Sequence, residues 1–251
     1  MNRVTKLLEH LPEMLRRDAA GEPPLFPPAD PLQYPRFLIP DLHAQPWYDA
    51  ARFPWTEAFA ANHRAIRDEL EAFLAQQQVT FRNYVGPLTG DGADAGEWHV
   101  LYLDYRGHRW DEHRAWFPRL MELVDAVPRR SGTVFVSRLT PGTHIPAHAG
   151  ATNAQLTCHF GIIVPEGVEM RVAREIRRQP AGRCTIFDDS FEHEVWNRSD
   201  QVRYNVFIQF WHPDLSEEEI AGIQQLEQLP RLQDVIKQYL VGASALVPVP
   251  N

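Results

Sequence analysis

The stretch GTVFVSRLTPGTHIPAHAGATNAQLTCHFGIIVPEGVEMRVA, residues 132–173, decides the fold. Within it the runs TVFVSRL, QLTCHFGIIV and EMRVA are rich in β-branched and aromatic residues, and the turn-forming PGTH and PEG separate them. The same pattern continues in RCTIFD (183–188) and RYNVFIQFW (203–211), with PAGR and NRSD as the turns. Several short strands at this spacing are typical of an all-β sandwich or barrel, so we predict a mainly β core.

Helical segments are predicted ahead of this β-rich part. Residues 1–18 and residues 55–78 both carry apolar side chains at helical spacing. Between them, residues 21–46 contain eight prolines, a density that prevents regular helix and central strand. We expect this segment to be an extended connector packed on the core.

Three further elements complete the predicted organisation. WHVLYLDY (98–105) has the composition of a strand, a loop rich in Gly and Asp precedes it at 86–96, and residues 114–127 have helical spacing. Ser216 with acidic residues behind it predicts the start of a C-terminal helix. The expected organisation is a helical and proline-rich N-terminal portion (1–97), a β catalytic core (98–215) and a helical tail (216–251).

The overall composition excludes some classes of partner. The net charge is −8 and the pI is near 5.8, which argues against nonspecific binding to nucleic acid or to an anionic membrane. Only two cysteines occur, Cys158 and Cys184, as expected in a reducing compartment. The sequence contains no signal-peptide pattern and no apolar run of about 18 residues. We therefore expect a cytoplasmic protein whose partner is a small molecule.

The histidines are the first candidates for chemistry, because no serine or cysteine lies in a nucleophile motif. Inward-pointing side chains from different strands of a barrel can converge, and imidazole is a good ligand for iron(II). His148 and His193 both stand beside small or polar residues at expected strand ends. The alternative is that each histidine only satisfies a local hydrogen bond. Five of the eleven histidines fall in the β-rich part: His144, His148, His159, His193 and His212.

The spacing around these histidines does not by itself define an iron site. Non-haem iron oxygenases commonly use two histidines and a carboxylate, here expected two residues after the first histidine. His212 and Asp214 have that spacing, but no histidine follows them. At His148 the corresponding residue is Gly150, which has no side chain to offer. On spacing alone the metal site is therefore a weak hypothesis.

A resemblance to a known family changes this interpretation. The stretches PGTHIPAHAGATN, HFGIIVP, MRVA, IFDDSFEHEVWN and WHPDL resemble the catalytic domain of the aspartyl/asparaginyl β-hydroxylases, most closely over 137–215 and more weakly from residue 35. The resemblance implies a double-stranded β-helix (a jelly roll, as in cupins) that binds Fe(II) and the cosubstrate 2-oxoglutarate. This family holds iron with two histidines and has glycine at the carboxylate position, so Gly150 fits its pattern.

The resemblance also implies roles for individual residues. His148 and His193 would be the iron ligands. Arg203, ten residues after His193, would bind the distal carboxylate of 2-oxoglutarate, since a guanidinium matches a carboxylate in geometry and charge. Ser137 would share that carboxylate, His159 would lie near the other end of the cosubstrate, and Trp98 would line the pocket. The alternatives are a surface position for Arg203 and plain core packing for Trp98.

Three further residues bear on the proposed site: Asp188, Asp189 and Thr157. Asp188 and Asp189 precede His193 closely enough to suggest metal ligands, but the family does not use them so, and we interpret them as orienting the turn. The family usually has an arginine at the position of Thr157. Either another arginine replaces it, or the substrate is not a plain aspartyl side chain. The candidates for replacement are Arg138, Arg171 and Arg174.

The implied function is hydroxylation of an unactivated C–H bond with Fe(II), 2-oxoglutarate and O2. The β-carbon of an aspartyl, asparaginyl or related amino acid, free or carrier-bound, is the expected target. Two alternatives stay open. A coordination position left by the missing carboxylate could accept chloride and give a halogenase, or the chain could be a non-catalytic module that binds metal and 2-oxoglutarate.

Overall fold

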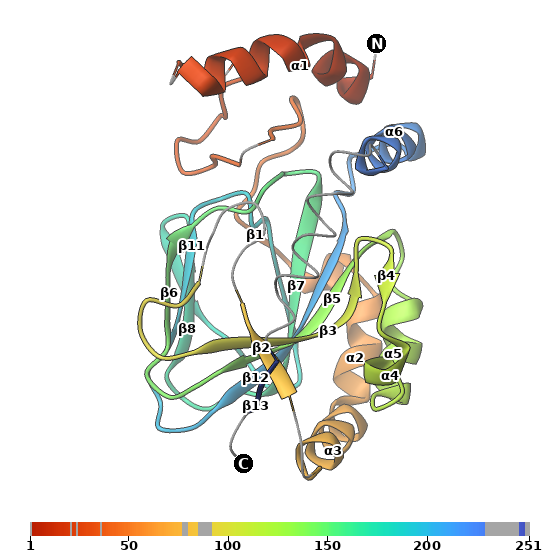
Figure 1. Cartoon of the computed structure of the whole chain (residues 1–251), viewed down its shortest axis with the longest axis vertical. Helices are drawn as coiled ribbons and strands as arrows, with labels where there is room; N and C mark the ends of the chain where they lie inside the picture. Colours follow the sequence, from red (N-terminus) through yellow and green to blue (C-terminus); the bar gives the residue numbers. More distant parts are fainter. Residues whose placement is uncertain are drawn as a thin grey trace.

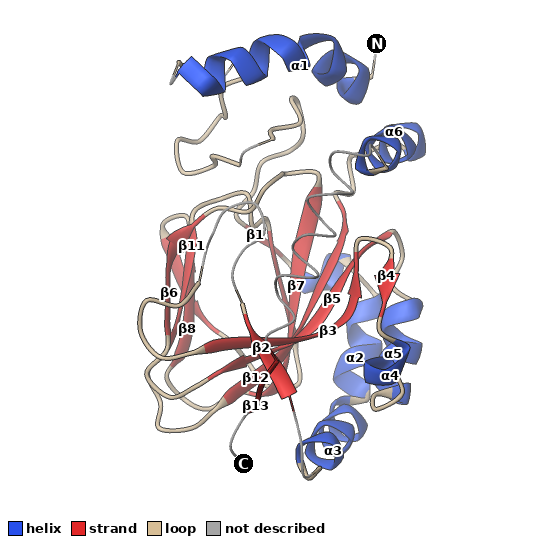
Figure 2. Cartoon of the chain, viewed as in Figure 1, coloured by secondary structure: helices blue, strands red, loops and turns tan. Residues whose placement is uncertain are grey.

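The computed structural model describes residues 2–20, 22–23, 25–35, 37–76, 80–84, 92–228 and 246–248. Two β-sheets face each other, and helices cover the outer side of the larger one (Figure 1, Figure 2). The helices are α1 (Arg3–Ala20), the 3₁₀ helix η1 (Ala50–Arg52), α2 (Trp55–Ala61), α3 (His63–Leu74), α4 (Asp111–Arg114), α5 (Pro118–Asp125) and α6 (Glu217–Glu227). The strands are β1 (Trp47–Tyr48), β2 (Thr80–Asn83), β3 (Trp98–Tyr105), β4 (His108–Arg109), β5 (Arg130–Leu139), β6 (His144–His148), β7 (Gln155–Ile163), β8 (Val168–Val172), β9 (Glu175–Arg178), β10 (Cys184–Phe187), β11 (His193–Asn197), β12 (Arg203–Trp211) and β13 (Leu246–Pro248).

The strand order is that of a double-stranded β-helix. The larger sheet runs β1-β10-β7-β12-β5-β3-β2-β13, with β4 beside β3, and the smaller sheet runs β6-β11-β8-β9. Neighbouring strands in both sheets are antiparallel, and the chain crosses between the sheets after β5, β6, β7, β9, β10 and β11. The prediction of a mainly β, jelly-roll core flanked by helices is confirmed. Strands β1, β2 and β13 lie outside residues 98–215 yet join the larger sheet, and the division into three portions stays a prediction.

Strand β12 gives the larger sheet its two different faces. Successive side chains of a strand point to opposite faces. Val206, Ile208 and Phe210 belong to the apolar core that includes Ile66, Leu70 and Phe73 of α3. Arg203, Phe207 and Gln209, on the other face, line a cavity between the sheets. The alternation thus sends Val206, Ile208 and Phe210 toward the helices and Arg203, Gln209 and the Phe207 ring into the interior of the barrel.

Two of the predicted helices are interrupted. The expected helix at 55–78 is α2 followed by α3, with Asn62 at the junction in a non-helical conformation (φ −107°, ψ 10°). Its backbone N–H and its side-chain amide both donate to the carbonyl of Ala58, at 3.2 and 2.7 Å. The expected helix at 114–127 is α4 followed by α5, and α5 begins at Pro118, whose missing N–H is tolerated at the first helical position.

The terminal helices agree with prediction. Helix α1 forms, although the side chains of Leu7, Leu11 and Leu15 lie outside the described residues. Helix α6 follows Ser216, whose hydroxyl accepts from the Glu219 N–H at 3.2 Å while the Glu219 carboxylate accepts from the Ser216 N–H at 2.9 Å, a capping box. Of the loop expected at 86–96, residues 92–96 are described. In the described ranges no helix is long and apolar enough to cross a bilayer.

The proline-rich connector is extended, as predicted, and it packs on two turns of the core. Gln33 pairs with Phe191 and Phe37 pairs with Thr152 in isolated β-bridges. The carbonyl of Leu32 accepts from the Glu192 N–H at 2.6 Å, and the carbonyl of Pro46 accepts from the Asp188 N–H at 3.1 Å. The connector therefore contacts the turn before β11 and the turn after β6 together.

Candidate active site

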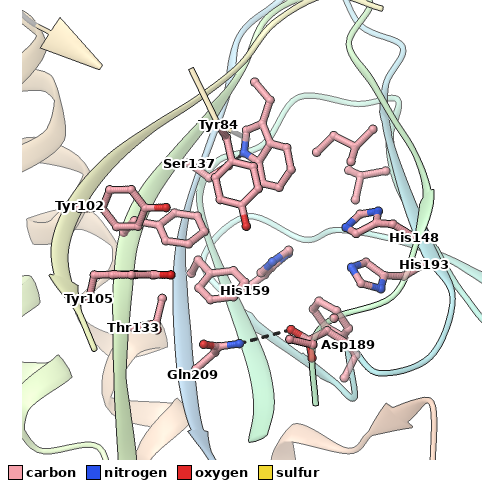
Figure 3. Close-up of a pocket in the computed structure, with 18 of the residues that line it drawn as sticks. Tyr84, Tyr102, Tyr105, Thr133, Ser137, His148, His159, Asp189, His193 and Gln209 are labelled. Atoms are coloured by element: carbon pink, nitrogen blue, oxygen red, sulfur yellow. Dashed lines mark hydrogen bonds between the residues drawn. The ribbon is translucent and has the colours of Figure 1, made fainter. Parts of the chain in front are cut away.

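His148 and His193 lie side by side on adjacent strands of the smaller sheet. They are opposite partners in the antiparallel pairing of β6 with β11, and their ring centroids are 4.1 Å apart. Both rings point into the cavity between the sheets (Figure 3). The pairing register of two strands is thus what places the two imidazoles side by side.

The backbone selects the tautomer of both rings. The Nδ1 atom of His148 lies 2.8 Å from the carbonyl oxygen of Pro146, and Nδ1 of His193 lies 2.9 Å from that of Phe191. A carbonyl can only accept, so each neutral ring carries its proton on Nδ1 and leaves the Nε2 lone pair for a ligand. Burial and the neighbouring His148 hold the pKa of His193 well below its usual range. This neutral form is the one that binds a metal.

Gly150 cannot be replaced by a carboxylate without a rearrangement. Its N–H donates 2.6 Å to the carbonyl of Asp189, and a Cβ atom here would lie 2.6 Å from the Asp189 Oδ1 atom. The Asp189 side chain therefore occupies the space that a third ligand at position 150 would need. Among the described residues, no cluster of three or more His, Cys, Asp or Glu side chains could hold a metal. The donor set available at this point is the pair of imidazoles.

A second polar cluster lies at the Arg203 end of β12. Arg203 is 2% exposed, and burial lowers its pKa to about 9. Its Nε and Nη2 atoms donate to the Gln179 carbonyl oxygen at 3.1 and 2.8 Å, and Nη1 donates to Ser137 Oγ at 3.2 Å and to the Asn205 side-chain oxygen. Within the described part of the chain no carboxylate pairs with it. A buried guanidinium with only neutral partners is a site for an anion.

Ser137 and Asn205 supply further donors beside this guanidinium. Ser137 Oγ accepts from Arg203 and, at 3.0 Å, from the indole N–H of Trp98. Its two lone pairs are therefore used and its own proton remains available to donate. The Asn205 amide nitrogen is buried with no acceptor among the described residues. Both donors suit an anion bound to Arg203.

His159 has the opposite tautomer from the histidine pair. The Gln179 carbonyl oxygen faces Arg203, so its amide N–H faces His159 Nδ1, 2.9 Å away. Nδ1 of His159 is thus an acceptor and the proton sits on Nε2. Burial, Arg203 and His193 hold the pKa of His159 well below its usual range. His159 lines the cavity as a neutral hydrogen-bond donor.

Comparison with known proteins identifies the family. Residues 60–213 match the family described as aspartyl/asparaginyl beta-hydroxylase. The chain belongs to this family. The resemblance predicted from the sequence motifs is confirmed by this match.

Individual β-hydroxylase relatives are longer than this chain. It is 32% identical over 204 residues to the human aspartyl/asparaginyl beta-hydroxylase, covering 78% of this chain and 26% of that protein. It is 34% identical over 173 residues to the ornithine lipid ester-linked acyl 2-hydroxylase of Rhizobium tropici, covering 67% of this chain and 61% of that protein. It is 31% identical over 192 residues to human aspartate beta-hydroxylase domain-containing protein 2, covering 72% of this chain and 51% of that protein. A 2OG-Fe(II) oxygenase family structure from Burkholderia pseudomallei overlaps with a TM-score of 0.43 at 13% identity, covering 67% and 95%, too weakly to bear on function.

All six predicted site residues of this β-hydroxylase family member line or touch one cavity. Trp98 does more than fill the core, because it stacks on Tyr84 with ring centroids 3.8 Å apart and donates to Ser137. Asp188 orients the turn as predicted, accepting from the Ser190 N–H at 3.0 Å. Asp189 instead faces the cavity. The six are Trp98, Ser137, His148, His159, His193 and Arg203, and their roles stay predictions.

None of the three arginines considered as replacements at position 157 lies in the cavity. Arg138 contacts the His99 ring, Arg171 pairs with Glu192 and Glu194, and Arg174 pairs with Asp30. The Thr157 hydroxyl donates 2.9 Å to Asp189 Oδ2. A neutral side chain bonded to a carboxylate therefore stands where the family usually has a cation.

Several site residues were not identified from the sequence. Asn205 and Gln209 lie two and six residues after Arg203 on β12, so strand alternation alone could have placed them on the cavity side. Gln179 lies directly after β9, outside any strand, and gives no such signal.

The connector is expected to position His193 through Gln33. Gln33 is 2% exposed, and its amide donates to Ser190 Oγ at 3.0 Å and Asp188 Oδ2 at 3.4 Å, in the turn that leads to His193. We expect Gln33→Leu to lose about 1–3 kcal/mol of unfolding free energy and about tenfold in Fe(II) affinity, because buried acceptors lose their donor and the ligand turn loosens. Denaturant titration and anaerobic metal binding measure both.

The control for Gln33 is Tyr34→Phe, which removes only an exposed hydroxyl that donates to Glu192 at 2.8 Å. Exposed polar interactions of this kind contribute little to the free energy of unfolding. Equal loss of metal affinity in the two variants would contradict a specific role for Gln33.

Buried His212 is expected to make the fold acid-sensitive. Burial lowers its pKa, its Nδ1 accepts from the Asp214 N–H at 3.2 Å, and its Nε2 lies 3.2 Å from the carbonyl of His43. A lowered folded pKa gives stability that is present above the unfolded value of about 6.5 and is lost as pH falls through the folded value. Between pH 7 and 5, His212→Gln should lose less unfolding free energy than wild type. The control is His108→Gln, at an exposed histidine on β4. Parallel curves for wild type and His212→Gln would contradict this.

Proposed function

We propose that this chain is an Fe(II)- and 2-oxoglutarate-dependent hydroxylase of an unactivated C–H bond. The observation that carries the proposal is one cavity with two different binding ends. One end has two imidazoles with their Nε2 lone pairs free, and the other has the buried Arg203 guanidinium with no carboxylate partner among the described residues. A metal and a dicarboxylate would satisfy both ends at once.

The residues present fit both groups. His148 and His193 would hold the iron, and Gly150, packed against Asp189, leaves the imidazole pair without a third side-chain ligand. Arg203 and Ser137 would hold the distal carboxylate of 2-oxoglutarate, with the Asn205 amide as a further donor. When bound, iron and 2-oxoglutarate supply the oxidising chemistry, using O2 to hydroxylate the substrate with release of succinate and CO2.

The chain itself contributes orientation and exclusion of water. The carbonyls of Pro146 and Phe191 fix the two ligand rings, and the Gln179 amide fixes both Arg203 and His159. Preorganised partners of this kind need no rearrangement during the reaction. Apolar side chains from both sheets line the same cavity as the histidine pair and would limit the access of water to it: Phe135, Ile145, Phe187, Val195 and Phe207.

An amino-acid β-carbon, free or carrier-bound, is the proposed target. The names of the relatives differ in this respect, since one is an aspartyl/asparaginyl beta-hydroxylase and another an ornithine lipid ester-linked acyl 2-hydroxylase. A small substrate is favoured, because the cavity has a volume of about 130 Å³ and aromatic side chains line it.

The test is succinate formation. Protein loaded anaerobically with Fe(II) and 2-oxoglutarate should release succinate when O2 is admitted, and a variant with both His148→Ala and His193→Ala should not. Binding of iron and 2-oxoglutarate with no succinate, whatever amino acid is added, would instead favour a non-catalytic binding module. Failure to bind either would overturn the proposal.

A further inference from the structure

One buried amide connects the guanidinium of Arg203 with the imidazole of His159. Gln179 lies directly after β9 of the smaller sheet and is 8% exposed. Its side chain reaches across to β12 and β7 of the larger sheet, which carry Arg203 and His159. Figure 3 shows His159 in the cavity between Ser137 and the histidine pair. The amide therefore links the anion-binding end of the cavity to the side of the histidine pair.

The guanidinium of Arg203 is almost fully used by neutral acceptors. Nε and Nη2 each donate to the Gln179 carbonyl oxygen, at 3.1 and 2.8 Å, and Nη1 donates to Ser137 Oγ and to the side-chain oxygen of Asn205. Of its five N–H groups, all but the second one on Nη2 thus have an acceptor among the described residues. A carboxylate that binds through two hydrogen bonds therefore has to displace at least one of these acceptors.

Ser137 and Asn205 can give way to an anion, because each also has a donor to offer. Ser137 has a hydroxyl proton, and the Asn205 amide nitrogen is buried without an acceptor in the described part of the chain. Both N–H groups of Gln179 are already used, on His159 Nδ1 at 2.9 Å and on Met170 Sδ at 3.9 Å. Turning this amide over would aim its N–H groups at a guanidinium, which cannot accept. The Gln179 amide is therefore the fixed member of the cluster.

We propose that Gln179 is a positioning residue that holds Arg203 and His159 as one unit, so that an anion binds at the Nη1 side of the guanidinium while His159 keeps its proton on Nε2. This rests on the proposed function, since the anion is the distal carboxylate of 2-oxoglutarate. Ser137 and Asn205 turn from acceptors to donors when the anion binds. Position 179 must accept from a guanidinium and donate to an imidazole, and a carboxylate, which only accepts, cannot do both.

The first experiment follows the side-chain amides of the wild-type protein by NMR. Zn(II), which is diamagnetic, replaces Fe(II), and spectra are recorded with and without 2-oxoglutarate. We expect the Asn205 amide protons to shift and to exchange more slowly when the cosubstrate binds, because they gain an acceptor. The Gln179 amide protons should exchange slowly in both spectra and should not shift. Rapid exchange at Gln179, or a shift at Gln179 in place of Asn205, overturns the inference.

The second experiment replaces the amide with a carboxylate of the same shape. In Gln179→Glu the proton of His159 should move from Nε2 to Nδ1, because the side chain at 179 then only accepts. ¹⁵N NMR of the histidine-labelled apo protein identifies the protonated nitrogen, and the His159 signal is assigned by its absence from His159→Gln. 2-Oxoglutarate should bind about tenfold more weakly or worse, because the new carboxylate competes for Arg203.

The matched control is Asn205→Asp, which brings the same charge to the same guanidinium but has no hydrogen bond with His159. It should weaken 2-oxoglutarate binding to a similar extent and leave the His159 proton on Nε2. A proton on Nδ1 in wild type, or one that stays on Nε2 in Gln179→Glu, overturns the inference. The apo spectra need neither metal nor cosubstrate. If wild type fails to bind 2-oxoglutarate, the proposed function fails, and the His159 tautomers alone decide the role of Gln179.

Discussion

Arg203→Met should abolish the preference for 2-oxoglutarate over pyruvate. Pyruvate has the same 2-oxo acid head but no distal carboxylate, so it does not need the guanidinium. Removing one partner of a buried charge pair costs about 2–5 kcal/mol, which corresponds to a loss of about 30-fold or more in 2-oxoglutarate affinity. Anaerobic titration of the Fe(II) protein with both acids gives the two dissociation constants.

A loss of stability in Arg203→Met cannot by itself change the ratio of the two affinities. Arg203→Met leaves the side-chain oxygens of Gln179 and Asn205 without a donor, so the fold should lose about 1–3 kcal/mol for each. Misfolding would weaken both acids alike. Loss of 2-oxoglutarate binding alone supports the assignment, and an unchanged ratio would contradict it. Ser137→Ala should show the same selective loss at smaller size, because it removes one neutral donor.

Gly150→Asp should weaken the metal site instead of completing it. A carboxylate at this position is the usual third ligand of non-haem iron oxygenases. Here its Cβ would lie 2.6 Å from Asp189 Oδ1 and 3.1 Å from the Asp189 carbonyl oxygen, so the Asp189 side chain must shift. We expect this shift to disturb the turn that leads to His193. We expect Fe(II) affinity to fall about tenfold or more, as when groups that orient metal ligands are changed.

The matched variant for Gly150→Asp is Gly150→Ala, which adds the same Cβ without a charge. Overpacking costs about 1–3 kcal/mol, so both variants should lose unfolding free energy, and the aspartate variant more because two carboxylates meet. Metal titration and denaturant unfolding distinguish the cases. Tighter iron binding in Gly150→Asp than in wild type would show that the turn relaxes and that Asp189 does not block the position.

The β core was predictable because its strands carry a local signal. In RYNVFIQFW the alternation of side chains sorts Val206 and Ile208 toward the helices and Arg203 and Phe207 toward the cavity. The boundaries of the helices were harder to predict from the sequence. At Asn62 the backbone leaves the helical conformation between two segments with helical spacing, and the spacing of apolar side chains does not report such a local change.

The candidate site was predictable only in part. The roles proposed for His148 and His193 came from the family resemblance. Spacing alone predicts a carboxylate ligand at position 150, where the chain has glycine. The pairing of strands depends on contacts between residues far apart in the sequence. One sequence therefore could not predict that the ring centroids of His148 and His193 lie 4.1 Å apart. The same holds for Asp189. Its carboxyl bonds to Thr157 on a different strand, and nothing in the turn sequence distinguishes it from Asp188, which faces Gln33.

The most direct test of the account is a single turnover with labelled oxygen. Protein loaded with Fe(II) and 2-oxoglutarate is exposed to ¹⁸O2 in the presence and absence of asparagine, and the succinate is analysed by mass spectrometry. We expect one labelled oxygen atom per succinate, and no succinate from the His148→Ala, His193→Ala double variant. Unlabelled succinate, or labelled succinate from the double variant, would contradict an oxygenase that depends on this histidine pair.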